Sequence, residues 1–224
     1  MSFLLCPKTI LIVSLGVAMA ATAYPYTKEY VLYSLHPIAM CLFIWASISA
    51  SIMLQRTDSQ AKTAAERKRN VSNHAVLQII ACIAACVGFW AVNQNKTNKG
   101  KRHWESWHGV IGLLTFALTV AVSILGTAMR YFPVTTFGGI GASKKWTCFK
   151  RYTGLVLMGL TVYVTGTGLL EHSTIQRIPG WERYTIFVVV VLSSGFCFWN
   201  CAFEYVGKEF RRFVRSGPEY EQLA

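Results

Sequence analysis

Long apolar stretches alternate with short polar segments along the whole chain. The apolar stretches lie near residues 4–24, 31–54, 73–93, 107–129, 152–170 and 183–203. A bilayer core about 30 Å thick is crossed by about 20 apolar helical residues, so each stretch predicts one membrane-spanning helix. The polar segments are too short for a second domain. The pattern therefore predicts an all-α membrane protein in which residues 1–224 form one bundle of six transmembrane helices.

Composition agrees with this prediction. Hydrophobic residues make up 53% of the chain and charged residues 14%, and the mean hydropathy is +0.38, which is too apolar for an ordinary soluble domain. The first stretch also fits a cleavable signal peptide ending near the "ATA" at 21–23. We favour a retained span, and both alternatives give the later helices the same orientation. The seven cysteines form no CxxC motif, so we interpret them as small buried side chains.

Basic residues set the expected orientation. With the N-terminus in the cytosol, 15 Lys and Arg residues fall on the cytosolic side and seven on the other. The positive-inside rule favours this topology, with the tail, residues 205–224, also in the cytosol. Basic loops beside anionic lipid account for the net charge of +12 without a nucleic-acid partner.

Three of the five histidines open predicted spans. His36, His74 and His108 stand at the starts of the second, third and fourth spans, 38 and 34 residues apart. Successive spans are antiparallel, so His36 and His108 are expected near the outer face and His74 near the cytosolic face. Each ring taken alone is explained by a polar contact with a neighbouring helix. The repetition instead favours a cofactor, since two imidazoles facing each other across a bundle suit a six-coordinate haem iron.

The residues around these histidines resemble a known family. "SLHPIAM" at 34–40, "SNH" at 72–74 and "HWESWHG" at 103–109 are similar to motifs of the short, six-helix cytochrome b561 proteins. The resemblance implies two b-type haems that pass electrons from cytosolic ascorbate, or another small anionic donor, to monodehydroascorbate or a ferric chelate on the other side. It implies that His36 and His108 hold the outer haem and that His74 is one ligand of the cytosolic haem. A homodimer is compatible with it.

The chain departs from the family pattern at one ligand. The pattern places a fourth histidine four residues before a glycine at the start of the fifth span, where this chain has Lys150 before Gly154. His172 cannot replace it, because 22 further helical residues span about 33 Å, and His103 lies in an outer loop. Three alternatives remain for the cytosolic iron: ligation by Lys150 as a neutral amine, a five-coordinate iron on His74, or no stable haem. Cys148 is an outside candidate.

Two groups of polar residues are candidate substrate sites. The cytosolic cations Arg67, Lys68, Arg69 and Arg151 would attract an anionic donor, although binding to lipid headgroups explains them equally well. His103, after two basic residues, is placed to meet an anionic acceptor, whereas Trp104 and Trp107 suit interfacial anchors.

The expected activity is that of an ascorbate-dependent transmembrane oxidoreductase. One rival is a one-haem protein that exchanges electrons only at the outer face, and the other is a haem-free structural or transport protein. "YEQL" at 220–223 resembles a sorting signal. It favours an endosomal or lysosomal membrane, with the secretory vesicle, endoplasmic reticulum and plasma membrane as alternatives.

Overall fold

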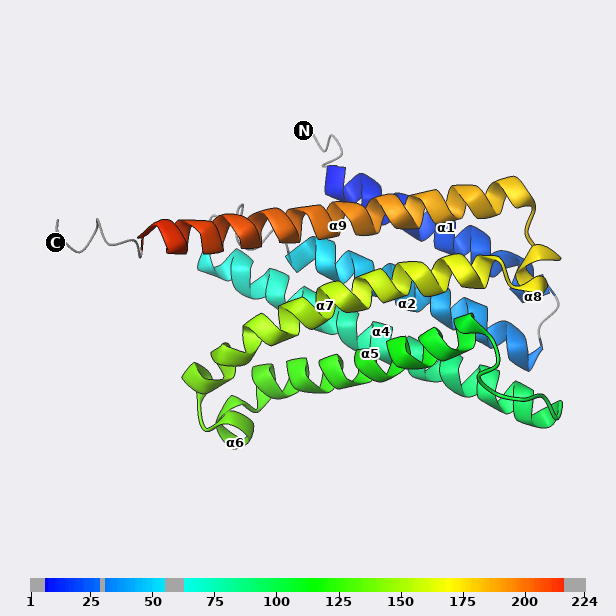
Figure 1. The fold of residues 1–224 in the computed structure, drawn as a ribbon, viewed down its shortest axis with the longest axis horizontal. Helices are drawn as coiled ribbons and strands as arrows, with labels where there is room; N and C mark the ends of the chain where they lie inside the picture. Colours follow the sequence, from blue (N-terminus) through cyan, green and yellow to red (C-terminus); the bar gives the residue numbers. More distant parts are fainter. Residues whose placement is uncertain (1–6, 29–30, 55–62, 216–224) are drawn as a thin grey trace.

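Six long helices form the protein (Figure 1). The structure is a computed structural model that describes residues 7–28, 31–54 and 63–215. The long helices are α1 (Pro7–Lys28), α2 (Leu35–Leu54), α4 (Ala64–Asn98), α5 (Trp107–Tyr131), α7 (Ile140–Leu169) and α9 (Gly180–Arg215). Three short helices, η1 (Leu32–Ser34), α6 (Pro133–Phe137) and α8 (His172–Ile175), lie in the connections. All six long helices are long and apolar enough to cross a membrane, which confirms the predicted all-α fold and its six spans.

Several helices extend beyond the spans predicted from hydropathy. α4 begins at Ala64 rather than near 73, where the side chain of Thr63 caps it by accepting a hydrogen bond from the backbone N–H of Glu66 at 3.2 Å. α7 begins at Ile140 rather than near 152, directly after Gly138 and Gly139, whose positive φ angles of 75° and 153° form the turn. Hydropathy detects only the part of a helix that lipid surrounds, so it misses these polar first turns.

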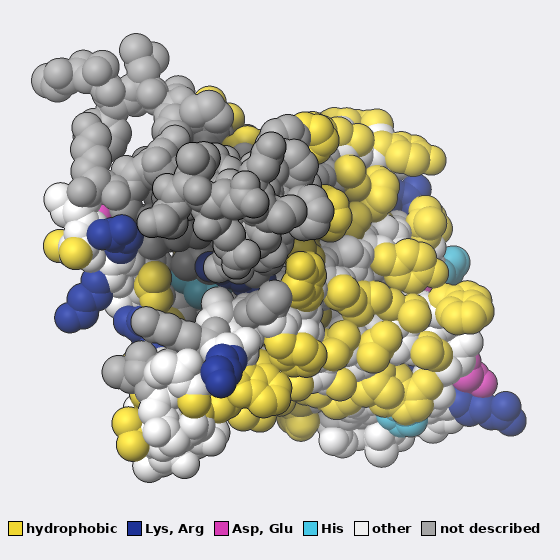
Figure 2. Space-filling view, turned by 60° about the vertical axis from the view of Figure 1, so that its left-hand side comes forward, with side chains coloured by type: hydrophobic (Ala, Val, Ile, Leu, Met, Phe, Trp, Pro, Cys, Tyr) yellow, Lys and Arg dark blue, Asp and Glu magenta, His cyan; other side chains and the backbone are white. Residues whose placement is uncertain are grey.

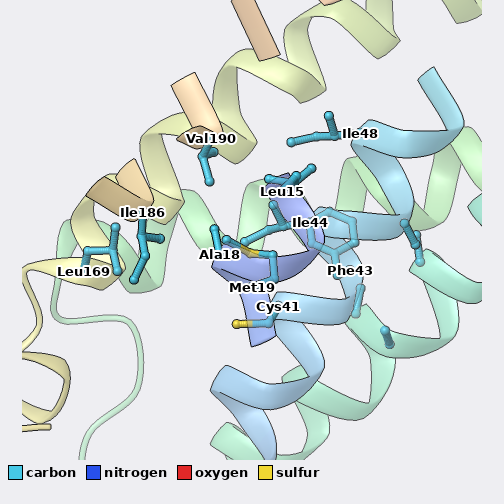
Figure 3. Close-up of a cluster of buried hydrophobic side chains, with 14 of the residues drawn as sticks. Leu15, Ala18, Met19, Cys41, Phe43, Ile44, Ile48, Leu169, Ile186 and Val190 are labelled. Carbon is cyan, nitrogen blue, oxygen red and sulfur yellow. The ribbon is translucent and has the colours of Figure 1, made fainter. Parts of the chain in front are cut away.

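The best-buried apolar cluster lies between α1, α2 and α9 (Figure 3). Leu15 and Met19 of α1 meet Ile44 of α2 and Val190 of α9, and each is at most 8% exposed. α1 therefore packs as a core helix, as expected of a retained span. The prediction of buried cysteines holds for Cys41, which joins this cluster, but is wrong for Cys86, which is exposed on α4. An exposed cysteine is tolerated there because lipid, like a core, is apolar.

The other four helices form a second group in which α2 lies along α4 and α5 lies along α7. α4 also contacts α5, whereas α2 and α5 make few direct contacts along their described lengths. Apolar side chains cover much of the surface, and Lys and Arg side chains gather toward its ends (Figure 2). We call the end with α8 and the 99–106 loop the outer end, and the end with α6 the inner end, after the expected topology.

Candidate functional site

Two histidines meet at the outer end of the bundle. His36 lies in the first turn of α2, and His108 is the second residue of α5, directly after the helix cap formed by Ser106. Their ring centroids are 6.4 Å apart, and the ring planes are nearly perpendicular, at 85°. Both side chains are partly buried. The structure thus brings together the two imidazoles that the sequence placed at one depth.

Backbone carbonyls orient both rings. Nδ1 of His36 lies 2.9 Å from the carbonyl oxygen of Gly88 on α4, and Nδ1 of His108 lies 3.2 Å from that of Val164 on α7. Thr167 adds a hydroxyl 3.3 Å from the His108 nitrogen. A carbonyl oxygen only accepts, so each Nδ1 must donate and therefore carries the proton. The other nitrogen, Nε2, keeps its lone pair for a metal.

The outer pair fits the axial positions of a haem iron. With a metal–nitrogen bond of about 2 Å on each side, two ligating imidazoles place their nitrogens about 4 Å apart and their ring centres about 6 Å apart. The observed 6.4 Å agrees with this separation. Among the described residues no three His, Cys, Asp or Glu side chains cluster as a metal site, so a planar macrocycle would have to supply the remaining ligands. Space is present beside His108, since a Cβ atom at Gly112 would meet only Val164, at 3.9 Å.

A second station lies at the inner end. His74 of α4 has its Nδ1 3.0 Å from the carbonyl oxygen of Ala50 on α2, so its Nε2 is free in the same way. Lys150 of α7 extends toward α5, where its Nζ lies 2.7 Å from the point at which a Cβ atom of Gly126 would stand. His74 and Lys150 are close enough for their charges to interact. The structure therefore brings these two predicted residues together and keeps them away from the outer pair.

The remaining predicted cations face water at the inner end. Arg67, Lys68 and Arg69 lie in the first two turns of α4 and are exposed. Arg151 is also exposed, directly after Lys150 on α7. They form a basic surface around the inner mouth of the bundle.

Of the two other histidines, only His103 approaches the outer pair's helices. Its Nδ1 lies 3.2 Å from Oδ1 of Asn93 on α4, and its ring packs on Trp104. Trp104 has a positive φ of 62° and stacks on Phe89 of α4, with ring centroids 5.8 Å apart. A positive φ is strained for a bulky residue, so the stack holds the loop in this shape. His172 is instead exposed and contacts Gln176.

The comparison with known families bears directly on these four helices. The sequence model described as eukaryotic cytochrome b561 matches residues 35–176. The chain belongs to the cytochrome b561 family. The match starts at the first residue of α2 and ends just after α8, so it covers every helix that carries a station residue and leaves out α1 and α9.

Curated relatives within the b561 family are similar over part of the chain. The sequence is 32% identical over 83 residues to the transmembrane reductase CYB561D2 of Bos taurus. It is 31% identical over 83 residues to the proteins of the same name from Mus musculus and Homo sapiens. Each match covers 37% of this chain and 37% of the relative.

Sequence reasoning missed two residues beside the stations of this b561 protein. Arg130 of α5 donates a hydrogen bond from Nη2 to Oγ of Ser72 on α4 at 2.8 Å, and its charge is felt by Lys150. An arginine inside an apolar stretch was the available signal. Tyr33 lies beside His36, with ring centroids 6.2 Å apart, and its hydroxyl contacts Ser173 at 2.8 Å. Its place three residues before a candidate ligand was the only clue.

Proposed function

We propose that the protein moves electrons across its membrane, from ascorbate or a similar anionic donor at the inner end to monodehydroascorbate or a ferric chelate at the outer end. The observation that carries this proposal is the pairing of His36 with His108, with both Nε2 atoms free. The family membership supports it, as does the name transmembrane reductase carried by the matched relatives.

The two stations divide the membrane into shorter steps. Ala50, which orients His74, lies 14 residues after His36 on α2, or about 21 Å along the helix axis. The hydrocarbon core is about 30 Å thick, and electron tunnelling falls steeply with distance. Haem b held by His36 and His108, and a second haem held by His74, would supply reversible one-electron chemistry at iron. The chain's part is to bind, orient and keep water from these positions.

Charged side chains at the two ends suit anionic reactants. We propose that Arg67, Lys68, Arg69 and Arg151 attract the donor, because a cluster of cations raises the local concentration of an anion. At the outer end His103, held by Asn93, is the proposed contact for the acceptor. The sorting pattern at 220–223, which favours an endosomal or lysosomal membrane, lies outside the described residues.

Purified protein in sealed vesicles tests this function. Vesicles loaded with ascorbate and carrying the protein are expected to reduce an external ferric chelate. The His108→Ala variant is expected to abolish this transfer, because the outer station loses one of its two imidazoles. A His108→Ala variant that transfers electrons at the wild-type rate would contradict the proposal. A pyridine haemochrome assay on the same samples counts haem per chain, and a value of one would favour exchange at the outer face only.

A further inference from the structure

The four matched helices repeat one arrangement in two antiparallel halves. On α2 and α4, His36 contacts the carbonyl oxygen of Gly88, and His74 contacts that of Ala50. Each helix carries its histidine 14 residues before the carbonyl that orients the partner's histidine. Exchanging α2 with α4 therefore carries the outer histidine onto the inner one.

α5 and α7 follow the same rule. A Cβ atom at Gly168 of α7 would lie 3.0 Å from Cε1 of His108, and one at Gly126 of α5 would lie 2.7 Å from Nζ of Lys150. Each helix carries its polar residue 18 residues before the glycine that accommodates the partner's side chain. Exchanging α5 with α7 therefore carries His108 onto Lys150. The inner counterpart of the pair His36–His108 is the pair His74–Lys150.

The surroundings of Lys150 do not supply another role for its nitrogen. Lys145 and Arg151 of the same helix are exposed, as headgroup-binding cations should be, whereas Lys150 is partly buried and reaches the glycine of α5. No carboxylate pairs with Nζ anywhere in the described ranges, and the nearest charge, on Arg130, has the same sign. A nitrogen removed from water without a partner is costly, so a Lewis acid at this position would stabilise it.

We propose that the amine nitrogen of Lys150 is the axial ligand opposite His74, which makes the inner haem a histidine–lysine site. The inference rests on the haem binding of the proposed function. On ligation the ammonium group releases its proton to water, and the nitrogen lone pair forms the bond to iron. The counterpart position to His108 then keeps a nitrogen ligand, although the residue has changed.

Spectroscopy of the full-length protein in detergent tests this ligand without an activity assay. Electron paramagnetic resonance and near-infrared magnetic circular dichroism distinguish bis-histidine from histidine–amine ligation in ferric haem. The wild type is expected to show both low-spin signatures. Lys150→Leu is expected to convert the histidine–amine component to a high-spin one, and Lys150→His to replace it by a second bis-histidine signal. Lys145→Leu, an exposed control on the same helix, is expected to leave the spectra unchanged.

The outcomes separate this inference from the proposed function. A wild-type protein with a high-spin inner haem, or with one haem only, would overturn ligation by Lys150, and so would an unchanged spectrum in Lys150→Leu. If His108→Ala still removes a bis-histidine component in those cases, the outer station and the family chemistry stand. If the protein binds no haem, both fail. Should Lys150→Leu not fold, the change of signal in Lys150→His decides the question.

Discussion

The orientation of single imidazole rings decides what this protein can hold. His36, His74 and His108 each place Nδ1 against a backbone carbonyl of another helix, which fixes the proton on Nδ1 and leaves Nε2 for a ligand. The sequence predicted the depth of these histidines, because their place at the start of apolar stretches is visible in the residue pattern. It did not predict the carbonyls, since any residue type supplies one and only the helix packing selects Gly88, Ala50 and Val164.

Gly168 controls the position of the His108 ring. Gly168→Ala is expected to lower the free energy of unfolding by about 1–3 kcal/mol, because the new methyl group would stand 3.0 Å from Cε1 of His108 and must displace it. The matched control is Gly159→Ala on the same helix, where a Cβ atom meets no neighbouring atom within 4 Å. Thermal unfolding and the absorbance of bound haem measure both variants. Equal behaviour of the two would show that Gly168 does not constrain the ring.

The helices gain rigidity at the outer end from the short helix α8. Tyr26 of α1 contacts the hydroxyl of Thr174 at 3.0 Å, and Tyr33 of η1 contacts Ser173 at 2.8 Å. α8 thus ties the connection between α7 and α9 to the start of α2, beside His36. Hydropathy could predict the long helices but not this tie, because the hydroxyl pairs are about 140 residues or more apart in sequence.

A double-mutant cycle measures this tie. Tyr26→Phe and Thr174→Val are each expected to lower the free energy of unfolding by about 1 kcal/mol, because Tyr26 is 1% exposed and each change leaves a buried hydroxyl without its partner. The double variant is expected to cost less than the sum of the two. Tyr24→Phe, at an exposed tyrosine of the same helix, is the control and should be neutral. Strict additivity in the cycle would contradict a direct hydrogen bond.

The bundle as one unit places its two stations at opposite ends, and the uneven distribution of basic residues orients them. Both halves of α2, α4, α5 and α7 follow the same spacing, which the sequence contains but which only becomes visible once the contacts of Gly88, Ala50, Gly168 and Gly126 are known. The six spans and their order could be predicted because lipid imposes a length and an apolar composition. The helix extensions at Ala64 and Ile140 could not, since polar first turns carry no such constraint.

The expected topology places both termini in the cytosol. Epitope tags at the N- and C-terminus are expected to be cleaved by protease added to intact cells only after the plasma membrane is selectively permeabilised, because 15 of the 22 Lys and Arg residues fall on that side. A cysteine introduced at Lys99, beside the exposed outer loop, should remain protected from an impermeant thiol reagent under the same conditions. Protection of either terminal tag would reverse the assignment of donor and acceptor ends.

The pairing of His36 with His108 is tested most directly by the haem spectrum of substituted protein. His36→Ala and His108→Ala are each expected to remove the same bis-histidine component, since one ring cannot hold a six-coordinate iron alone, and added imidazole is expected to restore it. His172→Ala, at an exposed histidine of the outer end, should leave the spectrum intact. Retention of the wild-type bis-histidine component in either His36→Ala or His108→Ala would contradict the account.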